Sequence, residues 1–234
     1  MDMCQIYKTI IIGRRLFIDD GKGLILIDTG SIESFHQTGI ITIAGVQHQV
    51  STSYKGMDAV CMSMILGVDM HGVLAMDIIQ QYVMWINTSE FGDFVIFEEY
   101  DVTKSQILNS SRLDCLPSIE LRVPELGVVR LLIDTSSPIT YMKGASCFCE
   151  SGFINDIYGK SVMQYEVSVD FDMFNGGFLY DSRSIKKLGC VEPDANIREL
   201  LERTRCSGII GYDLIEQFRV CFRYGVFRMP PQGI

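Results

Sequence analysis

The sequence predicts a mostly β protein built from two related halves, with a few short helices. Three observations predict this fold class. Two segments repeat in the same order, most of the remaining patterned segments alternate or are rich in β-branched and aromatic residues, and helical spacing is limited to short stretches. The 234 residues, of which 47% are hydrophobic and 21% are charged, are enough to bury a core.

The first repeated segment is an apolar strand that ends in an acidic turn. Residues 24–31 read Leu-Ile-Leu-Ile-Asp-Thr-Gly-Ser and align with residues 130–137, which read Arg-Leu-Leu-Ile-Asp-Thr-Ser-Ser. A second pair follows in the same order, because residues 72–82 align with residues 208–218 through an apolar-apolar-small step that runs into Asp. Two copies in one order are much harder to obtain by chance than one. The chain is therefore predicted to be duplicated.

The two halves are predicted to be residues 1–103 and 119–234, joined by a polar linker over residues 104–118. From the Asp of the turn to the Asp of the later step, the spacing is 77 − 28 = 49 residues in the first half and 213 − 134 = 79 in the second. The second half therefore carries an insertion.

Part of the insertion is predicted to be a helix over residues 196–205, with Asn196 as its N-cap. Asp77 and Asp213 each precede an apolar pair and are interpreted as N-caps of helical turns, although a repeated Asp pair can also suggest catalysis. The remaining patterns predict strands over residues 41–43, 46–50, 164–169 and 219–222, with turns at 44–45, 175–177 and 224–225.

Charge and composition argue against several classes of partner. The net charge of −9 repels phosphate backbones, so no nucleic-acid partner is expected. Polar residues interrupt the most apolar stretch, residues 59–76, and the apolar run near the N-terminus is too short for a signal peptide. No membrane association is expected, and the chain is predicted to be cytoplasmic.

No metal or cofactor is predicted. The three histidines lack metal-ligand spacing. The eight cysteines do not form a dense disulfide framework, so reduced thiols are expected. The close pair Cys147 and Cys149 leaves a redox or metal role as the alternative interpretation.

Asp28 and Asp134 are the candidate catalytic residues. Two carboxyl groups held close together cannot both ionise, so such a pair holds one proton. One member can then accept a proton from an attacking water while the other donates a proton to a peptide carbonyl.

The residues beside the two carboxyls are predicted to support them. The hydroxyl groups of Thr29 and Thr135 can hydrogen-bond across the interface between the turns. Those of Ser31 and Ser137 can donate to the outer carboxylate oxygens, and Gly30 allows a close approach of the backbone.

These motifs resemble the pepsin and retropepsin superfamily of aspartic proteases. The resemblance is carried by Asp28-Thr29-Gly30-Ser31 and by Gly208-Ile209-Ile210-Gly211 downstream of Asp134-Thr135, and it spans roughly residues 17–227. It implies a bilobal acid-protease fold of two closed β-barrels related by a pseudo-two-fold axis. It also implies a water-activating Asp dyad, an extended polypeptide substrate and a single chain that suffices as a monomer, with residues 73–75 and 209–211 supporting the turns.

Two residues depart from the pattern of that superfamily. Ser136 stands in place of Gly in the second Asp turn, and Ala75 stands in place of Gly in the first supporting step. Each adds a Cβ where backbones usually pack closely, which leaves the orientation of Asp134 open. The alternative function is a protease-like peptide-binding or scaffolding module with weak or no catalysis.

The resemblance also implies hairpin flaps over the catalytic pair. Tyr54 and Gly56 in the first half, and Tyr158 and Gly159 in the second, lie at similar distances after the Asp turns and are the candidate flap tips. An ordinary hairpin turn is the simpler interpretation. The methionines at positions 57, 62, 64, 70 and 76 are interpreted as core filling, with a Met-lined peptide groove as the alternative.

Overall fold

The computed structural model describes residues 4–89, 92–99, 116–123, 126–144, 149–155, 161–173, 178–190, 195–216, 220–223 and 226–228. Within these residues the protein is mostly strand, with four short helices. None of the helices in the described ranges has the length and apolar character that crossing a membrane requires.

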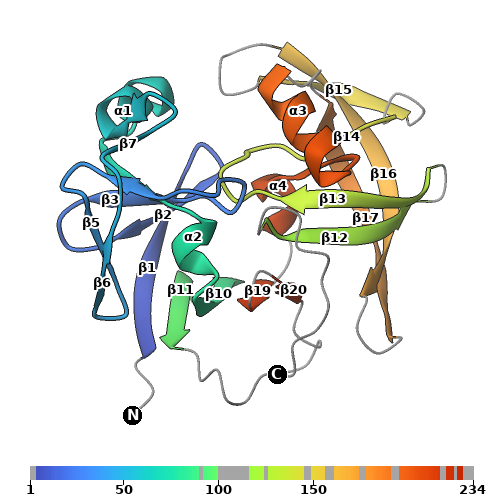
Figure 1. The fold of residues 1–234 in the computed structure, drawn as a ribbon. Helices are drawn as coiled ribbons and strands as arrows, with labels where there is room; N and C mark the ends of the chain where they lie inside the picture. The colour runs from blue at the N-terminus through green and yellow to red at the C-terminus, as the bar shows by residue number, and fades with distance from the viewer. Residues whose placement is uncertain are drawn as a thin grey trace.

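The N-terminal half comprises the described residues from 4 to 99, and it is coloured blue to green in Figure 1. Its elements are β1 (Cys4–Ile12), β2 (Arg15–Asp19), β3 (Leu24–Ile27), β4 (Phe35–His36), β5 (Ile40–Ile43), β6 (Val46–Gln49), β7 (Ser53–Tyr54), β8 (Met57–Asp58), α1 (Ala59–Leu66), β9 (Met70–Leu74), α2 (Met76–Ile79), β10 (Tyr82–Ser89) and β11 (Gly92–Glu99).

The C-terminal half comprises the described residues from 116 to 228, and it lies beside the N-terminal half in Figure 1. Its elements are β12 (Ser118–Val123), β13 (Gly127–Ile133), β14 (Tyr141–Met142), β15 (Cys149–Asn155), β16 (Ser161–Met173), β17 (Phe178–Cys190), α3 (Ala195–Thr204), β18 (Gly208–Ile210), α4 (Tyr212–Ile215), β19 (Val220–Arg223) and β20 (Val226–Arg228).

Two large sheets organise the strands. One sheet has the order β20-β19-β10-β11-β1-β2-β3-β9-β4, and the other has the order β14-β18-β13-β12-β16-β15, with β17 pairing with β16. Both orders are open paths, so no closed barrel is found among the described strands. Most neighbours are antiparallel, but β3 with β9 and β13 with β18 are parallel pairs.

The parallel pairs show that the sequence repeat is also a structural repeat. In the N-terminal half Leu26 pairs with Val73, and in the C-terminal half the equivalent residue Leu132 pairs with Ile209. The flanking strands β4 and β14 also keep the same register, because each lies antiparallel to its parallel pair at equivalent residues. Both halves therefore build the same local frame around their Asp turns.

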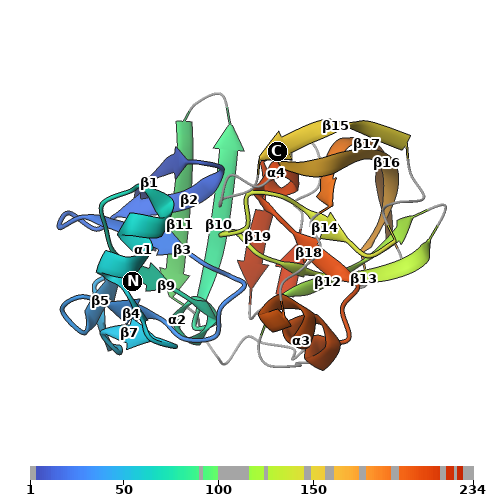
Figure 2. The same cartoon turned by 90° about the horizontal axis from the view of Figure 1, so that it is seen from above.

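Strands β10 and β19 join the halves in one sheet and lie side by side near the middle of Figure 2. Trp85 pairs with Cys221 in this ladder. The two residues are equivalent, because they keep the offset of the second repeated segment, 208 − 72 = 221 − 85 = 136 residues. A residue that pairs with its own equivalent lies on the axis that relates the copies. The pseudo-two-fold axis therefore passes between β10 and β19.

A continuous apolar core spans both halves. It contains Ile27 and Leu74 from the N-terminal half together with Ile133 and Ile210 from the C-terminal half, each no more than 3% exposed. Burial of apolar surface is the main favourable term in folding, so a shared core favours folding of the halves as one unit.

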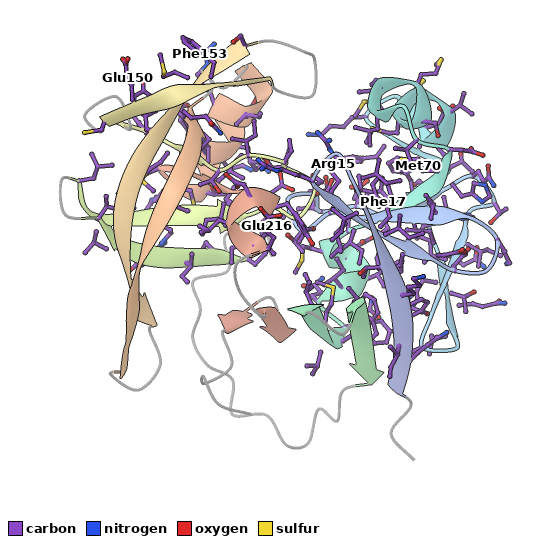
Figure 3. All side chains as sticks on the ribbon, turned by 180° about the vertical axis from the view of Figure 1, so that it is seen from behind. Arg15, Phe17, Met70, Glu150, Phe153 and Glu216 are labelled. Atoms are coloured by element: carbon purple, nitrogen blue, oxygen red, sulfur yellow. The ribbon has the colours of Figure 1, made fainter. Side chains whose placement is uncertain are left out.

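A second, smaller core lies within the N-terminal half around Phe17 and Met70 (Figure 3). The methionines divide between core and surface, because Met70 and Met76 are buried whereas Met57 and Met64 are 40% and 72% exposed. The core-filling prediction therefore holds for only some of them.

The predicted helix over residues 196–205 is confirmed as α3, but Asn196 lies inside this helix and is not its N-cap. The prediction that Asp77 and Asp213 are N-caps is wrong. The cap residues of α2 and α4 are Ala75 and Gly211, neither of which has a polar side-chain atom that could make a capping bond. The Asp77 and Asp213 side chains instead accept hydrogen bonds from the hydroxyl groups of Ser34 and Thr140.

Helix α1 was not predicted from the sequence. Asp58 caps it by accepting a hydrogen bond from the Cys61 N–H at 2.8 Å. Most of the predicted linker, residues 104–115, lies outside the described residues, and Ser118 already belongs to β12.

Candidate active site

Each candidate catalytic Asp lies at the end of a buried strand. Asp28 follows β3 and its N–H donates to the Leu74 carbonyl at 2.9 Å. Asp134 follows β13 and its N–H donates to the Ile210 carbonyl, also at 2.9 Å. The parallel partner strand thus fixes the backbone of each Asp by the same bond in both halves.

The predicted supporting steps at residues 73–75 and 209–211 contact the turns through the Leu74 and Ile210 carbonyls, and the residue after each step adds a second bond. The Met76 N–H donates to the Ser31 carbonyl at 3.1 Å, and the equivalent Tyr212 N–H donates to the Ser137 carbonyl at 2.7 Å. Ala75, which aligns with Gly211 in the other half, is fully buried without breaking this arrangement.

Four reciprocal hydrogen bonds link the two Asp turns through Thr29 and Thr135. The Thr29 hydroxyl donates to the Ile133 carbonyl at 2.7 Å and accepts from the Thr135 N–H at 3.1 Å. The Thr135 hydroxyl donates to the Ile27 carbonyl at 2.6 Å and accepts from the Thr29 N–H at 3.2 Å. Both Thr residues have no exposed surface, so water does not compete for these bonds.

The Asp28 carboxyl is held at both oxygens. Its Oδ1 accepts from the Gly30 N–H at 2.9 Å, and its Oδ2 accepts from the Ser31 hydroxyl at 2.7 Å. This is the support predicted for Gly30 and Ser31.

The Asp134 carboxyl receives its donors differently. Its Oδ1 accepts from the Ser136 N–H at 2.8 Å, the Ser136 hydroxyl at 2.7 Å and the Ser137 N–H at 3.1 Å. The Ser137 hydroxyl instead donates to the Ile139 carbonyl at 2.8 Å. The prediction that the Ser137 hydroxyl donates to the outer carboxylate oxygen is wrong, because Ser137 Oγ bonds to the following backbone.

Gly30 brings the two carboxyls together. Its N–H bonds to Asp28, while a Cβ built on Gly30 would lie 2.5 Å from both Cγ and Oδ2 of Asp134. A Cβ does not come that close to a carboxyl group, so Asp134 packs against a space that only a residue without a side chain leaves free.

The pKa of Asp28 is raised, as expected for one member of a carboxyl pair. Burial and, to a smaller extent, the charge of Asp134 raise the pKa of Asp28 to about 7. Hydrogen bonds from Ser31, Ser136 and Gly30 oppose the rise. Below about pH 7 the pair therefore retains a proton, which is the condition for combined acid and base chemistry.

A second pair of hydroxyl–carboxyl contacts lies behind the turns. The Ser34 hydroxyl donates to Asp77 Oδ1 and accepts from the Ala75 N–H at 2.8 Å. In the other half the Thr140 hydroxyl donates to Asp213 Oδ1 at 2.7 Å and accepts from the Gly211 N–H at 3.0 Å.

Sequence reasoning missed Ser34 and Thr140, although a signal was present. Both are hydroxyl residues at the same position after the Asp of the turn. Their contacts connect each supporting step to the Asp turn, so they position the backbone that carries Asp28 and Asp134.

The predicted flap tip in the N-terminal half is a hairpin turn. Tyr54 pairs with Met57, while Lys55 and Gly56 have φ values of 49° and 79°, as a two-residue hairpin turn requires. Tyr158 and Gly159 fall between β15 and β16 in the sequence and lie outside the described residues.

Among the residues that the structure describes, no group of three or more His, Cys, Asp or Glu side chains could hold a metal ion. The cysteines described as free thiols are Cys61, Cys149 and Cys206.

No protein-family model matches the chain, and no curated protein sequence is significantly similar to it.

Proposed function

We propose that this chain is an aspartic endopeptidase in which Asp28 and Asp134 activate a water molecule against a peptide bond. The proposal includes the bilobal acid-protease arrangement, with one Asp turn contributed by each half of a single chain. The observation that carries it is the contact of both carboxyls with Gly30, within a frame closed by the four Thr29–Thr135 hydrogen bonds.

In the proposed reaction, Asp134 is the general base and Asp28 is the general acid. Asp134 accepts a proton from the attacking water while Asp28 gives its proton to the carbonyl oxygen, which forms a tetrahedral intermediate. Asp134 then gives the proton it took from water to the amide nitrogen, while Asp28 takes back a proton from a hydroxyl of the intermediate. The C–N bond breaks, a carboxylic acid and an amine leave, and the pair again holds one proton. The raised pKa of Asp28 supports its role as the proton donor.

The proposed substrate is an extended polypeptide that docks as an added β-strand. The short β7–β8 hairpin, with Tyr54 and Gly56 at its turn, is the candidate flap of the N-terminal half. No nucleic acid, membrane or cofactor takes part in this proposal, and the cytoplasmic location remains a prediction from the sequence.

The test is cleavage of an unfolded protein, such as denatured casein, by the wild-type chain and by Asp28→Asn and Asp134→Asn. Each substitution should abolish cleavage, because an amide neither accepts nor supplies the required proton. Asp69→Asn, which changes an exposed carboxyl outside the turns, is the matched control. Wild-type cleavage should also fall as the pH rises through about 7, where Asp28 loses its proton. Cleavage that survives Asp28→Asn would rule out the dyad.

The second candidate function is a peptide-binding or scaffolding module with the same fold. The presence of Ser136 in place of Gly, with its hydroxyl against the carboxyls, favours this alternative. Binding of extended peptides by a wild-type chain that cleaves none of them at any pH between 3 and 8 would identify the module. A statine-containing peptide that binds to the wild type and not to Asp28→Asn would favour the enzyme.

A further inference from the structure

Ser136 lies in the second Asp turn and contacts the Asp134 carboxyl through its N–H and its hydroxyl. It is the counterpart of Gly30, since each lies two residues after its Asp. At Gly30 even a single added carbon would strike the opposite carboxyl. At Ser136 a Cβ and a hydroxyl are present. The two Asp turns therefore place different groups beside the carboxyl pair at this one position of the repeat.

The contacts of Ser136 concentrate on one oxygen. Its N–H and its hydroxyl both donate to Asp134 Oδ1, and the Ser137 N–H adds a third donor to the same atom. Asp28 receives one donor on each oxygen, from Gly30 and Ser31. Donors to a carboxylate favour its charged form.

We propose that Ser136 is a positioning residue that holds Asp134 as the ionised member of the pair, so that the shared proton stays on Asp28. A hydroxyl has one hydrogen and can donate it to only one carboxyl at a time. In the structure that donation goes to Asp134. The assignment of acid and base within the pair therefore depends on a residue that the first turn does not have.

Burial and charge act in the same direction. Asp28 is buried, at 9% exposed, whereas Asp134 is more open to solvent. Burial and the nearby charge of Asp134 raise the pKa of Asp28, and within the described residues Asp134 is the charged group that acts on it. Ser136 also lies close enough to Asp28 to lower this pKa by hydrogen bonding. Donation to Asp134 and donation to Asp28 are thus competing states of one hydroxyl.

The experiment is a carboxyl carbon NMR titration of the wild type, Ser136→Ala, Ser136→Thr and Ser137→Ala. Ser136→Ala should move the lower titration step of the pair up by about one pH unit, because a charge-assisted hydrogen bond is lost. Ser136→Thr keeps the hydroxyl and should titrate like the wild type. Ser137→Ala removes a neighbouring hydroxyl that bonds to a carbonyl, so it should leave both steps in place.

The result that overturns the proposal is a pair that titrates identically in the wild type and in Ser136→Ala. A shift of equal size in Ser137→Ala would also overturn it, because the effect would then not belong to the carboxyl-bound hydroxyl. If Ser136→Ala fails to fold, Ser136→Gly carries the same test, since it reproduces the residue of the first turn.

The consequence for rate rests on the proposed function, but the titration does not. If the chain cleaves peptides, the acid limb of its pH profile for kcat/KM should move with the lower titration step in Ser136→Ala. An unmoved titration in an active protease would reject the role of Ser136 and leave the protease proposal intact. A moved titration in a chain without peptidase activity would do the reverse.

Discussion

The two Asp turns share a frame and differ in the groups that contact their carboxyls. In both halves a parallel strand fixes the Asp backbone, a Thr bonds across the axis and a hydroxyl behind the turn joins it to the supporting step. Asp28 then receives its donors from Gly30 and Ser31, one on each oxygen. Asp134 receives three donors on one oxygen.

This comparison shows that one short motif contains two kinds of hydrogen bond. The symmetric bonds position the turns, and the asymmetric bonds act on the carboxyls. The four Thr29–Thr135 bonds set the distance between the halves, because each is made to a backbone group of the opposite copy. The asymmetric bonds decide which carboxyl is charged, because they are made to the carboxyls themselves. A pair that shares one proton needs both features, a fixed separation and two unequal members.

Gly30→Ala should give the largest effect and test whether the two turns are interchangeable. The added Cβ would lie 2.5 Å from Asp134 Cγ, and Asp134 is held in place by Ser136 and Ser137. The carboxyl must move, and a displacement of about 1 Å costs roughly a hundredfold in rate. We expect kcat/KM for an unfolded protein substrate to fall by about that factor or more.

The matched variant at the equivalent position is Ser136→Ala, which already has a Cβ and adds no volume. Its loss of kcat/KM should be clearly smaller than that of Gly30→Ala. Equal losses in the two variants would contradict the asymmetry of the turns. Thermal unfolding of both variants checks that the fold is retained.

Substitution of Thr29 and of Thr135 should lower the stability equally, in contrast to the unequal effects expected at Gly30 and Ser136. Thr29→Val and Thr135→Val each leave one buried carbonyl and one buried N–H without their partner. Each substitution should lower the free energy of unfolding by about 2–5 kcal/mol, as expected for two unsatisfied buried groups. Urea denaturation measures the change.

Thr29→Ser and Thr135→Ser retain the hydroxyl and should lose much less stability. A combined Thr29→Val and Thr135→Val variant should lose less than the sum of the single variants, because the four bonds form one network. A large difference in the free energy of unfolding between the two single Val variants would contradict the prediction. It would show that the two Thr residues contribute unequally although their hydrogen bonds are equivalent.

The sequence was sufficient to predict the frame because the frame is local and duplicated. The strands before Asp28 and Asp134 are short apolar runs, and the two copies support each other as evidence. The bridging role of Thr29 and Thr135 followed from a hydroxyl at the same place in both turns. Helix α3 was predicted because its apolar residues recur at helical spacing.

The remaining features depend on the tertiary surroundings, which periodicity does not encode. Helix α1 has apolar residues on all sides, with Val60 and Met64 exposed at 63% and 72%, so it shows no amphipathic pattern. The Ser137 hydroxyl was assigned to a carboxylate by analogy with Ser31, but the nearby Ile139 carbonyl takes its hydrogen bond. The difference in burial between Asp28 and Asp134 is likewise absent from the repeat, which reads Ile-Asp-Thr at both places.

The smallest expected effect concerns pH, and it separates Asp213 from Asp28. Burial raises the pKa of Asp213 to about 6, opposed mainly by hydrogen bonds from Thr140 and also by the charge of Arg14. A carboxyl with a raised pKa in the folded state stabilises the fold fully below its unfolded pKa, and this stabilisation is lost as the pH rises through the folded value. For Asp213 the free energy of unfolding should therefore decline between about pH 4 and pH 6, by about 1–3 kcal/mol.

Asp213→Asn cannot ionise, so the decline between about pH 4 and pH 6 should weaken in urea titrations of this variant. The amide oxygen can still accept from the Thr140 hydroxyl, which keeps the contact behind the second turn. A further decline toward pH 7 should persist in Asp213→Asn and disappear in Asp28→Asn, since the pKa of Asp28 is raised to about 7. If both substitutions remove the same part of the pH dependence of the free energy of unfolding, Asp213 and Asp28 do not titrate independently. That result would contradict the prediction.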